Sequence, residues 1–354
     1  MAHQPPLASP TRARRDAPWV WVAVWLLVML AGAFWVLRPA PAYVAPPGWA
    51  HMPETGPVLD VIAEGQDLIV AGRNGLFRVR DGDVGRVDVS GMAAAPVSYA
   101  LARDASGRLW IGHETGVTVM AETAPRHLDR IDGTLLKEVR ALEFDPQGRA
   151  WIGFNGGVGM IENAADFGAG GEARATLLRD DVRVLSALVD DQGGVWAGTT
   201  DGLWRFAPQN ATWQAWNTGD GLPNRQVASM MQDRDGRVWI GTGFHQQGGT
   251  LVFEPDGAAW RIAFELPAER MAAPKTRSLF QDGHGNIWLG TETNGFSVLA
   301  ADRQAATIVP GDKLPDVEVT SIGAMPGGGV WLGTLDGLVT LAPEAVSNGL
   351  RPER

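Results

Sequence analysis

The 354-residue sequence contains no cysteine and only 2 tyrosines, against 45 glycines and 15 tryptophans. The absence of cysteine excludes disulfide bonds, thiolate metal sites and cysteine nucleophiles, although it does not identify a compartment. No glycine-rich phosphate loop, nucleophile elbow or H-E-x-x-H motif occurs, and the 6 histidines are scattered singly along the chain. We therefore predict no catalytic residue, no cofactor and no metal site. The glycines lack a G-x-y period, which favours an all-β protein with many tight turns.

The formal net charge of −10 is spread unevenly along the chain. Residues 1–38 hold four arginines and one aspartate, a net of 4 − 1 = +3, so the remaining residues carry −10 − 3 = −13. An acidic domain of this kind repels phosphate backbones. Nucleic-acid binding is therefore disfavoured.

An uncharged segment follows the basic N-terminus. Residues 17–37 contain no charged side chain over 21 positions. As a helix they would reach roughly 31 Å, which matches the ~30 Å hydrocarbon core of a bilayer. Arg12, Arg14 and Arg15 precede the segment, so the positive-inside rule keeps the N-terminus in the cytoplasm. A cleaved signal peptide ending near Ala42 is the alternative. We predict a single-pass protein of the cytoplasmic membrane, divided into a cytoplasmic tail (1–16), a transmembrane helix (17–37), a proline-rich linker (38–47) and a periplasmic remainder.

One tryptophan motif recurs through the rest of the chain, as in Gly-Arg-Val-Trp-Ile-Gly ending at Gly241. Six copies place their tryptophans 41, 45, 43, 49 and 43 residues apart. A seventh, degenerate copy has Val70 in the tryptophan position, 40 residues before the first tryptophan. This spacing indicates a repeat architecture. The tryptophans, which we expect to pack between neighbouring repeats, are Trp110, Trp151, Trp196, Trp239, Trp288 and Trp331.

Each copy is predicted to form four short strands, separated by turns such as Asp145-Pro146-Gln147-Gly148. Seven units of this kind predict an all-β, seven-bladed β-propeller of four-stranded blades over residues 48–345, followed by a tail at 346–354. The last copy lacks a fourth strand, whereas residues 48–52 lie where a fourth strand would be. We predict that these residues complete the last blade, because the ring would otherwise leave an open edge.

The repeat D-x-x-G-x-x-W-[IL]-G-T-x-x-G-L resembles the two-component regulator propeller repeat. That family builds periplasmic sensor regions of bacterial hybrid histidine kinases, some of which sense carbohydrates. Copy one departs from the pattern at Val70, and copy seven has Met325 in place of aspartate. Since the sequence contains no kinase or receiver region, the resemblance implies a ligand-binding sensor domain without its signalling output.

Polar residues gather where the first strand of each repeat begins, 13 or 11 residues before the tryptophan position. In a propeller these positions lie at one rim of the central channel. The connection at residues 242–249 is longer than its counterparts and would overhang the same rim. The alternative is that channel mouths are wet and simply collect polar residues. The predicted ligand-binding residues are Glu138, Arg140, Arg183, Gln226, Lys275, Arg277 and Glu318, with His245 and Gln246 from the long connection.

These features together predict a membrane-anchored periplasmic propeller that binds a ligand or partner, as a sensor or accessory component of a signalling system. We expect a protein partner or a polar small molecule such as a carbohydrate. The alternative is a structural scaffold subunit that docks another membrane or periplasmic protein. A propeller lyase is a further, less favoured alternative.

Overall fold

The computed structural model describes residues 22, 25–29, 43–89, 97–121, 124–257 and 259–350. The chain divides into residues 1–44 and a compact unit of residues 45–354, and the description below concerns the second. The predicted transmembrane helix at 17–37 lies outside the described residues, except for residues 22 and 25–29. Within the described part of the chain, no helix is both long enough and apolar enough to cross a bilayer.

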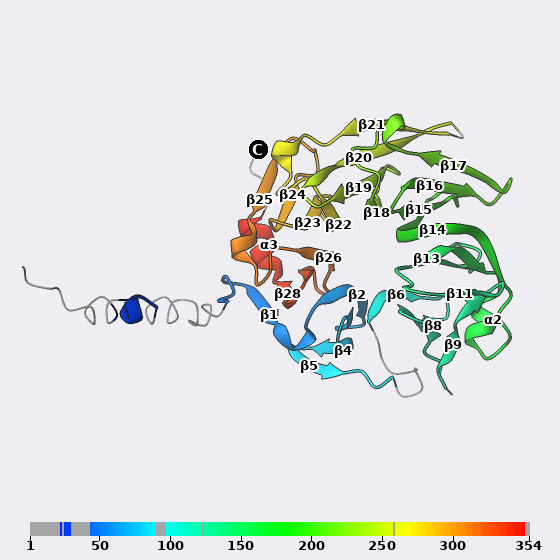
Figure 1. Ribbon diagram of the computed structural model, residues 1–354, viewed down its shortest axis with the longest axis horizontal. Coiled ribbons are helices and arrows are strands. Elements are labelled where there is room, and N and C mark those ends of the chain that lie inside the picture. Colours follow the sequence, from blue (N-terminus) through cyan, green and yellow to red (C-terminus); the bar gives the residue numbers. More distant parts are fainter. Residues whose placement is uncertain are drawn as a thin grey trace, which may run out of the picture. The chain divides into compact units, whose positions relative to one another are not determined.

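Residues 45–354 form a ring of antiparallel sheets around a central axis, and each sheet runs outwards from an inner strand (Figure 1). Five of these sheets are four-stranded and one is six-stranded. From the inner strand outwards, the first two sheets are β2 (Val58–Glu64), β3 (Asp67–Gly72), β4 (Gly75–Arg80) and β5 (Asp83–Arg86), and β6 (Ser98–Arg103), β7 (Leu109–His113), β8 (Gly116–Val119) and β9 (Arg126–Leu128). The six-stranded sheet contains β12 (Ala141–Phe144), β13 (Ala150–Ile161), β14 (Ala175–Val189), β15 (Val195–Thr199), β16 (Gly202–Ala207) and β17 (Thr212–Trp216). The last three sheets are β18 (Val227–Gln232), β19 (Val238–Phe244), β20 (Gln247–Asp256) and β21 (Ala259–Glu265); β22 (Thr276–Gln281), β23 (Ile287–Thr291), β24 (Phe296–Leu299) and β25 (Ala306–Val309); and β26 (Val319–Ala324), β27 (Val330–Thr334), β28 (Gly337–Leu341) and β1 (Trp49–Met52).

Short elements complete the described structure. They are the hairpin β10 (Arg130–Ile131) and β11 (Thr134–Leu135), the helices α2 (Ala164–Gly168) and α3 (Pro343–Gly349), and the 3-10 turns η1 (Pro53–Thr55), η2 (Thr218–Asp220), η3 (Ala268–Arg270) and η4 (Gly311–Lys313).

Among the described residues, the ring contains six sheets of four or more strands, so the prediction of seven separate four-stranded blades is wrong in this respect. The third and fourth repeats share the six-stranded sheet through β14, a strand of 15 residues. Its first part pairs with β13 and its second part with β15. The reason lies in the sequence, because residues 175–189 contain neither glycine nor proline, whereas each of the other connections between repeats contains one or both. No glycine or proline therefore separates these two repeats, and within β14 only Asp181 has a left-handed φ, of 58°.

The tryptophan-bearing strands are buried on both faces, as their apolar composition requires. Each tryptophan packs against apolar residues of the following repeat. Trp110, for example, lies in one buried cluster with Leu142 and Ile152, and Trp239 lies in another with Ile287 and Leu289. Trp151, Trp196, Trp288 and Trp331 lie in corresponding clusters. The core is therefore a series of clusters between adjacent repeats.

The last sheet contains strands from both ends of the ring. β1 pairs with β28 in antiparallel register, with Trp49 opposite Leu341 and Met52 opposite Leu338. This confirms the prediction that residues near 48–52 complete the last sheet, and it leaves the inner strands β26 and β2 side by side.

Candidate functional site

The inner strands carry a recurring irregularity at the position where the polar residues gather. In six of the seven repeats, one residue is skipped in the pairing with the next strand, 11 residues before the tryptophan position. Such a β-bulge redirects a side chain away from the regular alternation. The skipped residues are Leu59, Tyr99, Leu185, Ala228, Arg277 and Thr320, and in the third repeat Arg140 holds this position directly before β12.

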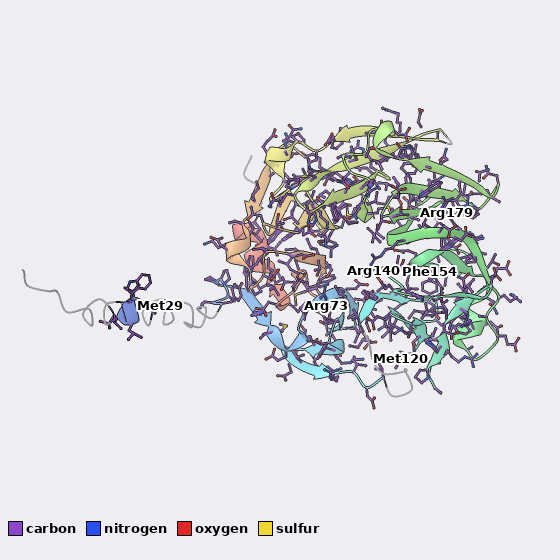
Figure 2. All side chains as sticks on the ribbon, viewed as in Figure 1. Met29, Arg73, Met120, Arg140, Phe154 and Arg179 are labelled. Atoms are coloured by element: carbon purple, nitrogen blue, oxygen red, sulfur yellow. The ribbon has the colours of Figure 1, made fainter. Side chains whose placement is uncertain are left out.

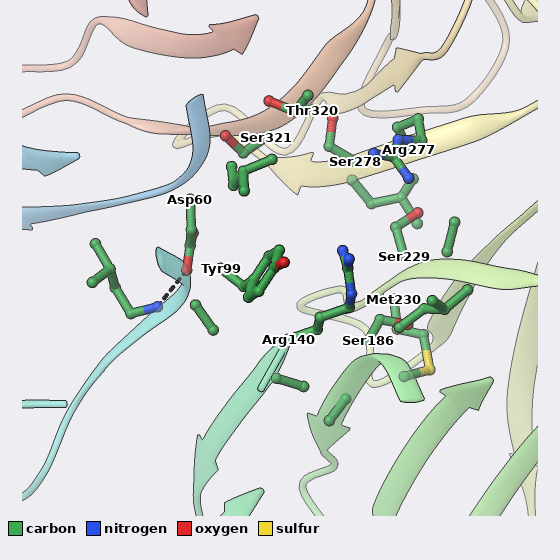
Figure 3. Close-up of a pocket in the computed structure, with 18 of the residues that line it drawn as sticks. Asp60, Tyr99, Arg140, Ser186, Ser229, Met230, Arg277, Ser278, Thr320 and Ser321 are labelled. Carbon is green, nitrogen blue, oxygen red and sulfur yellow. Dashed lines mark hydrogen bonds between the residues drawn. The ribbon is translucent and has the colours of Figure 1, made fainter. Parts of the chain in front are cut away.

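All seven of these side chains line a cavity of about 360 Å³ in the centre of the ring (Figure 3). The next residue of each repeat lines it too, and it is small in every repeat except the first, which has Asp60. Three serines at this level connect neighbouring repeats. Ser186, Ser229 and Ser278 each donate a hydrogen bond of 3.1–3.3 Å to a carbonyl of the following repeat. The bulge residues therefore supply most of the chemistry of this cavity.

A second cavity, of about 450 Å³, adjoins the first at the rim. Tyr99, Arg140 and Arg277 line both cavities. The rim is completed by charged residues of both signs, namely Arg73, Glu114, Glu292 and Glu318. We call this second cavity the mouth and the first the channel cavity.

Arg140 is held by Glu138 and by an aromatic ring. Its Nη2 donates to Glu138 Oε2 at 2.9 Å, and its guanidinium carbon lies 4.3 Å from the centre of the Tyr99 ring. Arg183 donates to the same Glu138 oxygen at 2.6 Å. Burial opposes ionisation of Glu138, but the two arginines outweigh it and hold the pKa of this carboxyl below its usual range. Figure 2 shows Arg140 at the inner side of the ring.

Across the channel, Arg277 and Lys275 are paired in the same way. Arg277 Nε lies 2.8 Å from Glu318 Oε1, and Lys275 Nζ donates to Glu292 Oε1 at 2.6 Å. In Figure 3, Arg140 and Arg277 extend into the cavity from facing walls, and Tyr99 lies on the side of Arg140 nearer to Asp60. Two opposed arginines, each contacted by a glutamate, therefore mark the boundary between mouth and channel cavity.

The remaining predicted residues lie at the rim or beside it. Gln226 directly precedes β18, and its carbonyl accepts the Gly243 N–H at 2.9 Å. His245 and Gln246 occupy the turn between β19 and β20, where they line a hollow of about 640 Å³ together with Glu292. Phe244, the last residue of β19, is 51 % exposed and contacts the His245 ring, with ring centres 4.0 Å apart and the two planes tilted by 58°. Since Glu292 also lines the mouth, this hollow and the mouth are neighbours.

Two acidic residues of the channel cavity were not predicted. Asp60 accepts the backbone N–H groups of Val61 and Leu101 at 2.8 and 2.7 Å, but burial dominates and raises its pKa to about 7. Glu143, in β12, has its pKa raised to about 8 by burial and then by repulsion from Asp60. Among the described residues no hydrogen-bond donor contacts the Glu143 carboxyl group. Alignment on the tryptophan contains a signal for Asp60, because it is the one charged residue at its level in the seven repeats.

The acidic pair is a poor metal site. Within the described ranges, no three histidine, aspartate or glutamate side chains are gathered closely enough to hold a metal ion. Two carboxyl groups fall short of the coordination number that protein-bound metal ions take. The pair is better suited to a group with a single positive charge.

The repeat resemblance is confirmed at residues 221–244, which match the family model of the two-component regulator propeller. The chain is also similar to the extracellular domain assigned to the hybrid two-component system BT3049 of B. thetaiotaomicron, with 19% identity and a TM-score of 0.69 over 86% of this chain. It spans 42% of that structure and 39% of the corresponding BT4673 domain. No curated protein sequence matches the chain.

Two other solved propellers are similar in fold. Virginiamycin B lyase from Staphylococcus aureus, determined with quinupristin, has 13% identity and a TM-score of 0.63, covering 83% of this chain and 98% of that one. YCF48 bound to a D1 peptide has 14% identity and a TM-score of 0.63, covering 86% and 99%. At these identities the likeness shows a shared β-propeller fold and nothing further.

Proposed function

We propose that this chain is a membrane-anchored, extracytoplasmic binding module of a signalling system, and that its ligand or partner enters the mouth of the propeller. The observation that carries the proposal is the row of bulges. A bulge lengthens one strand relative to its partner and disrupts the ladder locally. Its recurrence in six repeats directs a ring of side chains into one cavity, and two of the positions at this level hold arginine.

The charge of the mouth supports binding of a polar group. The residues around it comprise five cations, Arg73, Arg140, Arg183, Lys275 and Arg277, against four glutamates, Glu114, Glu138, Glu292 and Glu318. The charges around the mouth nearly cancel, with one more cation than anion, although residues 39–354 carry a net charge of −13, from −10 − 3. Arginines that are already oriented by a glutamate lose little side-chain freedom when a ligand arrives.

Binding is favoured over catalysis by the state of these groups. Each of Arg140, Arg183, Lys275 and Arg277 has an acidic partner within 3 Å, which holds its side chain in place. General acid–base catalysis instead needs a group that is oriented on the substrate and titrates near the working pH. Glu143 has the suitable pKa of about 8 but no orienting hydrogen bond among the described residues, and Asp60, with a pKa of about 7, has both carboxyl oxygens engaged by backbone N–H groups. We therefore propose a non-enzymatic role.

The location follows from the N-terminal sequence. We propose that residues 17–37 anchor the chain in the cytoplasmic membrane and that residues 48–345 lie in the periplasm. The sensor regions to which the fold is similar are described as extracellular, which supports this orientation.

A binding experiment tests the proposed function. The purified full chain is titrated calorimetrically with a panel of neutral oligosaccharides, sugar acids, organic acids and short peptides. For any ligand that binds, Arg277→Gln should weaken the affinity at least tenfold, because it removes a charge-assisted hydrogen bond of about 1.5–3 kcal/mol. The matched control is Arg174→Gln, since Arg174 forms an exposed 3.6 Å ion pair with Glu162, outside the residues that line the mouth. Equal affinity in both variants would remove the mouth from consideration.

A scaffold role is the second candidate, and the exposed turn between β19 and β20 favours it. Phe244 presents half of its surface to solvent beside the 640 Å³ hollow. Large exposed aromatic side chains of this kind are common anchors of protein interfaces. If a protein docks there, Phe244→Ser should abolish its binding while Arg277→Gln has no effect.

A further inference from the structure

The channel carries charges of opposite sign at different depths. Arg140 and Arg277 hold the same position in their repeats, 11 residues before the tryptophan, at the boundary with the mouth. Asp60 lies one position further along its strand, and Glu143 lies three positions beyond Arg140. At about 3.3 Å per residue, Glu143 is therefore roughly 10 Å further along the strand than Arg140. Asp60 and Glu143 line the channel cavity but not the mouth.

The outer layer of charges, formed by Arg140 and Arg277, has N–H donors that are available to a ligand. An arginine side chain carries five N–H bonds. Arg140 directs those of Nε and Nη2 to Glu138, which leaves the Nη1 group without a protein acceptor among the described residues. Arg277 approaches Glu318 through Nε at 2.8 Å. Both guanidinium groups line the channel cavity, so an anionic group between them would gain donors from two walls.

The inner layer of charges, formed by Asp60 and Glu143, contains no cation among the described residues. Asp60 and Glu143, whose carboxyl groups repel each other, both line the channel cavity, and for Glu143 no neutralising side chain is present among the described residues. Placing unpaired carboxylates in such surroundings is costly, and a positively charged group offsets this cost. An ammonium group, with three donors and a single charge, matches two carboxyl groups that are too few for a metal ion.

We infer that the channel cavity is a site for a small zwitterion, whose carboxylate lies between Arg140 and Arg277 and whose ammonium group lies deeper, against Asp60 and Glu143. This assignment rests on the proposed function and names its ligand class. A cavity of about 360 Å³ lies within the range of roughly 300–1,000 Å³ that small-molecule sites occupy. The separation of the two layers requires several bonds between the charged groups, as in an ω-amino acid or a short peptide.

The experiment compares molecules that differ in one charged end or in the spacing between the two charges. The purified full chain is titrated calorimetrically with 6-aminohexanoate, with hexanoate, with hexylamine and with glycine. Hexanoate and hexylamine each keep one charged end, and glycine keeps both but places them close together. We expect 6-aminohexanoate to bind at least tenfold more tightly than any of the three. Arg277→Gln should lower its affinity to that of hexylamine, and Glu143→Gln should lower it towards that of hexanoate.

Proton release supplies an independent readout. With the pKa of Glu143 at about 8, the carboxyl group is partly protonated at pH 7.5, and an ammonium ligand favours its ionised form. Binding should therefore release protons, and the measured heat should differ between phosphate and Tris buffers. Glu143→Gln should reduce this difference to the smaller contribution of Asp60, whose pKa is raised to about 7. A ligand that merely fills the channel would leave the heat independent of the buffer.

The outcomes separate this inference from the proposed function. Equal affinity for hexanoate and 6-aminohexanoate would overturn the zwitterion and leave an anion site. If no member of the series binds while another ligand of the panel depends on Arg277, the zwitterion is again overturned and the binding function stands. If neither the series nor the panel binds, both fail.

Discussion

At the scale of single residues, the aspartate of each turn has two roles, of which the sequence indicated one. In repeats two to six its Oδ1 accepts backbone N–H groups two and four residues later, which closes the turn. Its Oδ2 accepts the indole N–H of the tryptophan six residues later, at 2.8–3.1 Å. A buried indole N–H needs such an acceptor. The turn role could be predicted from the D-x-x-G pattern, whereas the bond to the indole depends on how the turn folds over the following strand.

Asp233→Asn should expose this double role. The amide nitrogen must face either the Trp239 indole N–H or the backbone N–H groups of Asp235 and Arg237, so one donor meets another donor. We expect the free energy of unfolding to fall by about 1–3 kcal/mol. Asp235→Asn is the control, because Asp235 is exposed and its ion pair with Arg237 is long, at 3.9 Å. It should change the free energy of unfolding by no more than about 0.5 kcal/mol. Urea denaturation measures both, and similar losses would show that the indole bond contributes nothing particular.

Single residues also explain which parts of the candidate site could be predicted from the sequence. Arg140 and Arg277 could be selected because charged residues at a fixed distance from the tryptophan stand out in an alignment of repeats. Their orientation into the cavity could not, because a bulge is a property of pairing between strands and leaves no fixed residue type at the skipped position. Glu143 escaped notice for a related reason, since its depth in the channel follows from the path of β12.

At the scale of elements, the repeat period predicted the strands well because every copy buries the same apolar positions between two neighbours. The separation into sheets was less predictable. Whether two repeats form separate sheets depends on a break in a connection, and residues 175–189 lack the glycine or proline that would make one. The closing strand was predictable because the last repeat lacks a fourth strand, whereas an extra strand precedes the first repeat and can supply it.

Removal of β1 tests how much the closure contributes. Deletion of residues 48–52 removes the partner of β28, the Trp49 contact with Phe296 and the buried Met52 side chain. Loss of Met52 packing alone should cost about 2–5 kcal/mol, and the unpaired edge of β28 adds to it. The melting temperature should therefore fall markedly. The control is deletion of residues 39–42, which shortens the linker but retains β1, and an equal effect of both deletions would assign the loss to linker length.

At the scale of the whole molecule, charge divides the chain. Residues 1–38 carry +3, and the remainder carries −10 − 3 = −13, so the acidic part is repelled by anionic lipid. The uncharged segment at residues 17–37, if it spans the bilayer as proposed, would hold the propeller near the membrane against this repulsion. Under this proposal, a stiff, proline-rich linker would limit how closely the ring approaches the bilayer. The orientation of the proposed anchor would decide which compartment supplies the ligand, so the binding proposal depends on it.

Cysteine labelling can test this orientation cleanly, because the natural sequence contains no cysteine and a single introduced thiol is the only target. Arg174→Cys places the thiol on an exposed part of the propeller, where the native side chain is 70% exposed, and Ala8→Cys places it in the N-terminal tail. We expect a membrane-impermeant maleimide to label the Arg174→Cys variant in intact spheroplasts and the Ala8→Cys variant only after lysis. Both variants should remain in the membrane fraction after carbonate extraction, since an apolar helix of about 20 residues inserts stably. If Ala8→Cys yields no labelled mature protein even after lysis, and Arg174→Cys is released as a soluble protein, the N-terminal segment is a cleaved signal and the anchor is wrong. Labelling of Arg174→Cys only after lysis would place the propeller in the cytoplasm and contradict the proposed location.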